Sequence, residues 1–349
     1  MPRFTYPRNY LRLKQGQRTL DPRLAIYYIT THCNLNCTYC EDFGARRNAD
    51  AVVTSTLNDA KKILKIIREG VNNLWITGGE PLLAPHLLDL LNYARQDLRF
   101  RELSLITNGT LLSRNLGLLP IVDRLIISLD AVEPSALASV GLENEKSQNL
   151  IQTIENIAPL QKKDNFKLIL NAVITPQTLP NMDSLIDFCA TNKIWLSFSP
   201  QAVNNWTHFD LLTSPEYSQF IKNTLKRKKS GSPILGSTAY LKTLLDQKPY
   251  ECYPTIIPRI MPDGWLIYPC LPMEKAGGEI GGRPVNLLKV SSWDEAWQIA
   301  KDRYGEAPSS CTSCFQQCYA EPSLMQSRPL AWLSEYLRTG IDLGTYAPG

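Results

Sequence analysis

The sequence predicts an α/β fold: a partial barrel of six strand–helix units, followed by a small cysteine-rich domain. Two observations carry this prediction. Short β-rich apolar segments alternate with longer helical segments over residues 24–200, and eight of the nine cysteines fall into two groups of short spacing. Parallel strands need crossover connections, and right-handed crossovers curl successive units in one direction. Six units fall short of a closed eight-stranded barrel.

The units follow one another in a regular order along the chain. Strands are predicted at Leu24–Thr30, Asn73–Thr77, Glu102–Thr107, Leu125–Leu129, Lys167–Ile174 and Trp195–Ser199. Helices are predicted at Leu57–Glu69, Pro85–Asp97, Lys146–Ile157, Met182–Asn192, Pro215–Lys229 and Thr238–Leu245. We divide the chain into an N-terminal extension at 1–23, the barrel core at 24–210, a helical connector at 211–249 and a cysteine-rich domain at 250–349.

Composition and charge fit a globular enzyme. The chain is 44% hydrophobic and 20% charged, and its net charge of +4 does not indicate nucleic acid binding. No apolar run approaches the roughly 18 residues that span a bilayer, and no secretory signal is recognisable, so a cytoplasmic location is expected. Grouped cysteines in a reducing compartment favour metal ligation over disulfides. The basic run 226–229 is expected to be a solvated helix end.

Three cysteines directly follow the first strand, in the order Cys33-Asn-Leu-Asn-Cys37-Thr-Tyr-Cys40. Three soft ligands in a tight loop suit an iron-sulfur cluster better than zinc, which would want a fourth protein ligand nearby. With three thiolates, one iron of a four-iron cluster stays open. An open iron can hold a small chelating molecule and pass it an electron.

Polar or glycine-rich residues also end the later strands. In such sheets ligands bind beyond the carboxyl ends of the strands, so these residues are expected to converge on one mouth. Gly-Gly-Glu-Pro could instead be an ordinary strand-to-helix turn, and Ser128 and Asp130 could be local caps. The strand-end candidates are Gly78, Gly79, Glu80, Thr107, Asn108, Ser128, Asp130, Asn171 and Ser199.

Residues 24–200 resemble the radical S-adenosylmethionine (SAM) superfamily. The resemblance rests on the Cys-x3-Cys-x2-Cys spacing, on Tyr39 before the third cysteine, and on Gly-Gly-Glu-Pro about forty residues later. It implies that SAM chelates the open iron and is cleaved to a 5'-deoxyadenosyl radical, with reduced ferredoxin or flavodoxin as electron donor. It also implies that Gly78, Gly79 and Glu80 meet the methionine amino group. The other implied cofactor contacts are Tyr39, Thr107, Asn108, Ser128, Asp130 and Asn171; no residue is assigned as catalytic.

The second cysteine group lies in the C-terminal third, with Gly264-Trp265 shortly before Cys270. It resembles the short auxiliary-cluster domains called twitch domains and has too few cysteines for the two-cluster SPASM form. The resemblance implies a second four-iron cluster, with Cys318 as a spare or alternative ligand. Zinc on the same thiols is the main alternative. The implied ligands are Cys252, Cys270, Cys311 and Cys314.

The C-terminal region is also similar to the adenosylhopane synthase family, through a Cys-x-Pro start, a Gly-Trp, a Pro-Cys and a later Cys-x-x-Cys. Ile106 stands where that family has a cysteine, so the same reaction is not implied. We expect a radical SAM enzyme acting on a small molecule, lipid or isoprenoid by hydrogen abstraction or radical addition, with peripheral membrane contact an option. The alternatives are a ribosomal-peptide maturase, against which the 32 residues before Cys33 count, and a non-enzymatic electron carrier.

Overall fold

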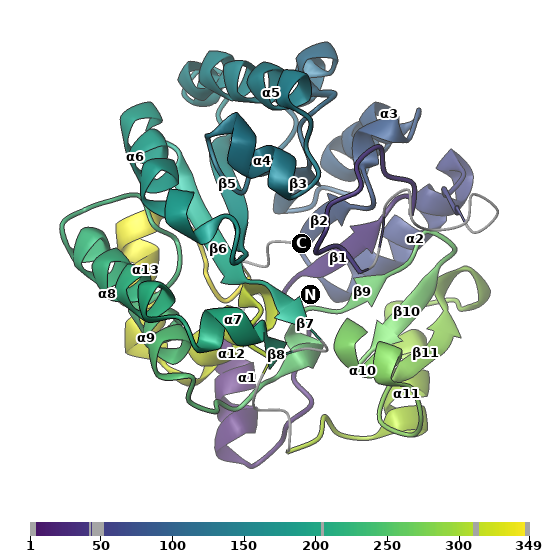
Figure 1. Ribbon diagram of the computed structural model, residues 1–349. Coiled ribbons are helices and arrows are strands. Elements are labelled where there is room, and N and C mark those ends of the chain that lie inside the picture. Colours follow the sequence, from purple (N-terminus) through teal and green to yellow (C-terminus); the bar gives the residue numbers. More distant parts are fainter. Residues whose placement is uncertain (1–4, 42, 44–51, 204–205, 310–313, 346–349) are drawn as a thin grey trace.

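The computed structural model describes the chain except for residues 1–4, 42, 44–51, 204–205, 310–313 and 346–349. Nine strands form one sheet in the order β11-β10-β9-β1-β2-β3-β4-β5-β6. The six neighbours from β1 to β6 pair in parallel. Figure 1 shows them as a curved inner layer with the helices outside. The predicted α/β partial barrel is therefore confirmed.

The core strands match the sequence prediction closely. Because helices cover their outer face and side chains fill the inside, these strands read as apolar runs. The first is shorter than predicted, since Thr30 makes only an isolated bridge to Thr54. The observed strands are β1 (Ala25–Tyr28), β2 (Asn73–Thr77), β3 (Glu102–Thr107), β4 (Arg124–Ser128), β5 (Lys167–Ile174) and β6 (Trp195–Pro200).

The core helices bury one apolar stripe each. The helix α2 (Leu57–Gly70) begins at Thr56, whose hydroxyl accepts from the Asp59 backbone N–H, a standard N-cap. One predicted helix is broken: residues 85–97 form α3 (Leu87–Asn92) followed by a π-helical turn, η3 (Tyr93–Asp97). The remaining core helices are α4 (Pro134–Ser139), which was not predicted, α5 (Asn144–Ile157) and α6 (Met182–Asn192).

The C-terminal region extends the core sheet. The strand β9 (Arg259–Ile260) pairs in parallel with β1, placing Arg259 opposite Ile26. The strands β10 (Trp265–Tyr268) and β11 (Gly282–Asn286) continue the sheet as antiparallel neighbours. The edge of β1 that would otherwise expose unpaired backbone groups is thereby covered. The sheet thus runs without a break across the predicted boundary at residue 250.

The remaining elements are mostly helices that pack around this extension. Helix α12 is buried on every side and is tied to β6, because the Gln317 N–H donates to Ser199 Oγ at 3.0 Å. Within the described residues, no helix is long and apolar enough to cross a membrane. These elements are α1 (Thr5–Lys14), β7 (Ala202–Val203), β8 (Trp206–Thr207), α7 (Phe209–Leu212), α8 (Pro215–Lys229), α9 (Thr238–Asp246), α10 (Leu271–Ala276), α11 (Trp293–Tyr304), α12 (Gln317–Ser327) and α13 (Pro329–Thr339).

The basic end of α8 differs from its expected role as a solvated helix end. Lys228 is buried, and its Nζ lies 3.0 Å from Glu335 Oε2 on α13. Arg227 pairs with Asp183 and Asp187 on α6. The expectation was wrong for these two residues, because their acidic partners come from elements distant in sequence. The run joins α8 to its neighbours and is not wholly solvated.

Candidate active site

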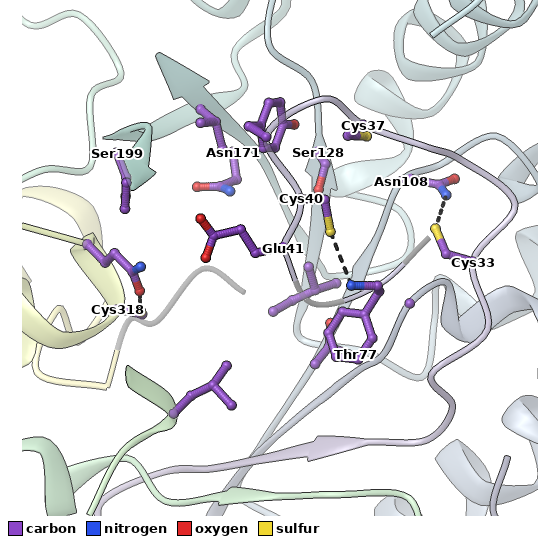
Figure 2. Close-up of a pocket in the computed structure, with 18 of the residues that line it drawn as sticks. Cys33, Cys37, Cys40, Glu41, Thr77, Asn108, Ser128, Asn171, Ser199 and Cys318 are labelled. Carbon is purple, nitrogen blue, oxygen red and sulfur yellow. Dashed lines mark hydrogen bonds between the residues drawn. The ribbon is translucent and has the colours of Figure 1, made fainter. Parts of the chain in front are cut away.

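A cavity of about 300 Å³ opens at the carboxyl ends of the parallel strands. Its wall includes the loop after β1, the ends of β2 to β6, and residues of the C-terminal region. Figure 2 shows Cys33, Cys37 and Cys40 on one side of this cavity and Cys318 on the other. The strand-end positions singled out from the sequence therefore do meet at one mouth, with one exception described below.

The three N-terminal cysteines share one wall, and two of their sulfurs accept hydrogen bonds. The Leu35 N–H lies 3.5 Å from Cys33 Sγ, and the Phe43 N–H lies 3.4 Å from Cys40 Sγ. The side-chain amide of Asn108 lies 4.0 Å from Cys33 Sγ. Donors of this kind favour sulfur that carries negative charge, as it does when it binds iron.

The three thiols lie close enough for their charges to affect one another. Among the described residues no three His, Cys, Asp or Glu side chains are close enough to hold a single metal ion. A four-iron cluster bonds each thiolate to a different iron and so does not need them to share one metal ion. Burial, with a smaller effect from the carboxyl of Asp130, raises the pKa of the Cys37 thiol to about 12. The free thiolate is therefore disfavoured there, and metal ligation would compensate for its charge.

Tyr39 connects the cysteine loop to the end of β4. Its hydroxyl donates to Asp130 Oδ2 at 2.6 Å, and the Val173 N–H donates to Asp130 Oδ1 at 2.8 Å. Burial raises the pKa of Asp130 to about 6, while these two hydrogen bonds oppose the rise. Asp130 is thus ionised at neutral pH and holds the loop by a charge-assisted bond.

Gly78 and Gly79 pack directly against the cysteine loop. A Cβ at Gly79 would lie 2.3 Å from the carbonyl oxygen of His32, and one at Gly78 would lie 2.5 Å from that of Thr30. The Gly79 N–H donates to Thr30 O at 2.9 Å. Only glycine allows this approach, so the turn after β2 positions the loop that carries the cysteines. Both glycines also line the cavity.

Glu80 lies behind the cavity wall. It is fully buried and is not among the residues that line the cavity. Its Oε1 accepts from the Leu82 N–H at 2.9 Å and from Thr107 Oγ1 at 2.7 Å, and its Oε2 accepts from the Asn108 N–H at 2.7 Å. The carboxyl group therefore ties the end of β2 to the end of β3. Its contact with the methionine amino group stays a prediction.

The other predicted contact residues do line the cavity. Asn171 Oδ1 accepts from Ser197 Oγ at 3.0 Å, which fixes the orientation of its amide. The Asn108 side chain also donates to Asn34 Oδ1 at 2.8 Å, on the cysteine loop. The predicted residues that line the cavity are Cys33, Cys37, Tyr39, Cys40, Gly78, Gly79, Thr107, Asn108, Ser128, Asp130 and Asn171.

The second cysteine group lies in the C-terminal region, and Cys311 falls outside the described residues. Cys252, Cys270 and Cys318 are buried, and Cys314 is partly exposed. Burial raises the pKa of the Tyr250 hydroxyl well above its usual value, and the thiols of Cys252, Cys314 and Cys318 raise it further. The Tyr250 hydroxyl also donates to the backbone carbonyl of Cys314, so Tyr250 contacts this cysteine group directly. Of the described cysteines in this group, Cys318 alone lines the main cavity.

Several residues of the cavity were not anticipated from the sequence. Arg259 on β9 and Lys275 on α10 both line it. The only signal for Arg259 is a charged residue inside the apolar segment Ile-Ile-Pro-Arg-Ile-Met. Its significance depends on the pairing of β9 with β1, which joins residues more than 230 positions apart. Sequence periodicity does not reveal pairings of this range.

Comparison with known proteins agrees with this geometry. The model of the Radical SAM superfamily matches residues 27–189. The 7-carboxy-7-deazaguanine synthase of Clostridium acetobutylicum is 30% identical over 189 residues, which is 54% of this chain and 75% of that protein. The chain belongs to the radical SAM superfamily. Radical SAM enzymes use a four-iron cluster and SAM, so the predicted enzyme class and cofactors are confirmed.

The matches to GTP 3',8-cyclases cover a smaller share of the relatives' own length. The GTP 3',8-cyclase of Limosilactobacillus fermentum is 30% identical over 171 residues, which is 47% of this chain and 49% of that protein. The chain thus spans about half the length of the GTP 3',8-cyclases that it matches. The shared part corresponds to the radical SAM core.

Solved structures extend the likeness beyond the core. Streptococcus suis SuiB bound to S-adenosylmethionine has a TM-score of 0.62 and 18% identity, covering 85% of this chain and 70% of that one. The structure of anSMEcpe with bound AdoMet and Cp18Cys peptide has a TM-score of 0.55 and 17% identity, covering 92% of this chain and 100% of that one. At these identities the likeness shows a shared fold. The shared fold includes the C-terminal region.

Proposed function

We propose that this radical SAM enzyme acts on a small molecule of lipid or isoprenoid type, by hydrogen abstraction or radical addition. When bound, the cluster and SAM supply one electron and a 5'-deoxyadenosyl radical. The single observation that carries the proposal is an exposed apolar rim of Trp206 and Phe209, which follows in the chain on the cavity-lining residues Gln201 and Ala202. The protein contributes binding, orientation and exclusion of water, because a primary carbon radical attacks whatever lies near it.

The proposed roles of the cavity residues follow from their positions. Cys33, Cys37 and Cys40 would bind the first cluster. Gly78 and Gly79 line the cavity, and their backbone would meet the methionine end of SAM. The nucleoside end would be held by Tyr39, Thr107, Asn108, Ser128, Asp130 and Asn171. Glu80 would support these residues by bracing β2 and β3.

The apolar rim supports an apolar substrate. Gln201 and Ala202 line the cavity, and the chain then continues into β8 and α7. Trp206 is 58% exposed and Phe209 is 72% exposed. Large apolar side chains grouped on a surface mark interaction sites for lipids, membranes or proteins. At the edge of a cavity they would guide an apolar molecule from a membrane surface.

The second cluster is proposed on Cys252, Cys270, Cys311 and Cys314, with Cys318 as the spare. Of the described cysteines in the group, Cys318 is the one that faces the cavity. Anaerobic reconstitution should then give about eight irons per chain. Cys270→Ala should lower this to about four while leaving some SAM cleavage. Full iron content in that variant would contradict the assignment.

A ribosomal-peptide maturase is the second candidate. The specific observation in its favour is that anSMEcpe, which shares this fold, was crystallised with a peptide. The same apolar rim would suit apolar residues of a peptide. An electron donor of ferredoxin or flavodoxin type is proposed for either function. A simple electron carrier is disfavoured, because it has no need of the Gly78-Gly79 turn or of a cavity beside the cysteines.

The deciding experiment compares substrates with the reconstituted full-length chain under dithionite. Vesicles containing polyprenyl lipids should increase methionine release from SAM. Hydrogen abstraction should also release 5'-deoxyadenosine and give a lipid that has lost hydrogen, whereas radical addition should give a lipid that has gained the mass of the 5'-deoxyadenosyl group. Trp206→Ser should weaken this stimulation without changing release in the absence of vesicles. Stimulation by peptides alone would favour the maturase. Release that no lipid changes, with no lipid product, would contradict the lipid proposal.

A further inference from the structure

Arg259 is a buried cation on the wall of the cavity. It is 4% exposed, and it reaches the lumen because β9 is the neighbour of β1 in the sheet. Its Nε donates to the Tyr319 hydroxyl at 2.8 Å, its Nη2 donates to Cys318 Sγ at 3.2 Å, and its Nη1 donates to the Tyr28 hydroxyl. The three acceptors are two tyrosine hydroxyls and a cysteine thiol, none of which is charged in its protonated form. The arrangement orients the guanidinium without supplying a carboxylate.

The charge of Arg259 has no acidic partner among the described residues, where no carboxylate oxygen forms an ion pair with it within 4.0 Å. A guanidinium has five N–H donors, and the described residues accept hydrogen bonds from three of them. Burying a cation without a counter-ion is costly, because the lost hydration is not replaced. A buried arginine at a cavity wall therefore favours an anion in that cavity.

The carboxylates that do lie at this cavity are engaged elsewhere. Glu41 lies 3.7 Å from Lys275 Nζ. Asp130 accepts from Tyr39 and from the Val173 N–H. Neither carboxylate is therefore in position to neutralise Arg259. Among the described residues that line the cavity, the C-terminal region contributes Arg259 and Lys275 and no carboxylate.

We propose that Arg259 binds a single oxyanion of the substrate, a carboxylate or a phosphate, which share acceptor oxygens that a guanidinium recognises. This inference rests on the proposed function and deepens it, since it makes the substrate amphipathic. The anionic end lies against Arg259 on the C-terminal wall. The rest of the molecule extends between the apolar rim and the cysteine loop, where the reaction takes place.

A purely structural role for Arg259 makes a different prediction. The guanidinium lies 5.0 Å from the centre of the Tyr319 ring and would then serve to hold two tyrosines together. If Arg259 had only this structural role, replacing it would lower the stability of the protein and leave anion binding unchanged. If Cys318 were a cluster ligand, the cluster would be the anionic partner of Arg259. No site for an oxyanion of the substrate would then remain.

The test is calorimetric titration of the cluster-reconstituted full chain with sodium acetate and, separately, with sodium phosphate at constant ionic strength. The wild type should bind one of the two saturably, which tells a carboxylate from a phosphate. Arg259→Gln should weaken that binding about tenfold or more, the value of one lost charge-assisted contact. Arg283→Gln is the matched control, because Arg283 pairs with Glu274 and does not line the cavity.

A second variant guards against misfolding. Arg259→Lys keeps the charge but loses the planar fork, so its binding should also weaken, whereas Arg283→Lys should bind as the wild type does. Wild-type chain that binds neither anion, or Arg259 variants that bind like the wild type, would overturn the proposal. Release of 5'-deoxyadenosine is measured on the same samples. Anion binding without SAM cleavage would refute the proposed function and leave this site standing.

Discussion

Tyr39→Phe tests how much the Tyr39–Asp130 hydrogen bond contributes to holding the cysteine loop against the core. The substitution keeps the ring and removes the hydroxyl that donates to Asp130 Oδ2 at 2.6 Å. Asp130 is 6% exposed and ionised at neutral pH, since its pKa is raised by burial to only about 6. Loss of a hydrogen bond to a buried charge costs about 2 kcal/mol. That cost corresponds to about a thirtyfold shift toward the undocked loop.

The assay is hydrogen exchange by mass spectrometry on the metal-free, reduced chain, read on peptides that cover residues 33–41. Exchange of this loop should speed up about thirtyfold in Tyr39→Phe, provided that exchange follows local opening. Tyr240→Phe is the control, because the Tyr240 hydroxyl donates to Phe315 O at 3.0 Å in another part of the molecule. That variant should leave the loop unchanged.

A double variant at Tyr39 and Asp130 separates the effect of the hydrogen bond from that of the aromatic ring. If the hydroxyl acts only through Asp130, Tyr39→Phe should have little further effect on loop exchange once Asp130 is alanine. The reasoning would be refuted by loop exchange within about twofold of the wild type in Tyr39→Phe, or by additive effects in the double variant. Lower iron retention in Tyr39→Phe after reconstitution should accompany faster exchange.

Two further predictions concern the turn after β2. Burial raises the pKa of Glu80 to about 7, so the native state holds this proton more tightly than the unfolded state does. The free energy of unfolding should therefore fall as the pH rises from about 4.5 to about 7. The total loss should be about 3 kcal/mol. Glu80→Gln should remove that slope in urea unfolding of the metal-free chain between pH 5 and 8; an unchanged slope would show that another group is responsible. Gly79→Ala should destabilise the chain by about 3 kcal/mol and lower iron content, because its Cβ would meet the His32 carbonyl at 2.3 Å. Gly117→Ala, with no atom within 4 Å of the added Cβ, should do neither, and equal losses in both variants would contradict the packing argument.

Much of the core was predictable because its signals are local. The strands β2, β3 and β5 lie where apolar periodicity places them, between turns that the sequence marks. The cysteine loop and the strand-end residues then meet because parallel strands present their carboxyl ends at one edge. For this reason a linear motif and a topology rule together located the part of the cavity formed by the cysteine loop and the strand ends, but not the wall formed by the C-terminal region.

What escaped prediction depends on contacts between distant parts of the chain. The strand β9 has two residues, too few for any periodicity, and it exists because it pairs with β1. Glu80 is a brace because Thr107 and Asn108 reach it from β3. Lys228 is buried because Glu335 meets it from α13. In each case a partner distant in the sequence determines the role of the residue, so the sequence alone does not determine that role.

The most direct test of the central claim is the release of 5'-deoxyadenosine by the anaerobically reconstituted chain, compared with its Cys37→Ala variant. The account predicts dithionite-dependent release by the wild type, and none by the variant, which should lack the core cluster's iron signal. Cys189→Ala is the control, because Cys189 is buried inside α6 and does not line the cavity. Undiminished release by Cys37→Ala would contradict the claim that the loop after β1 holds the cluster that cleaves SAM.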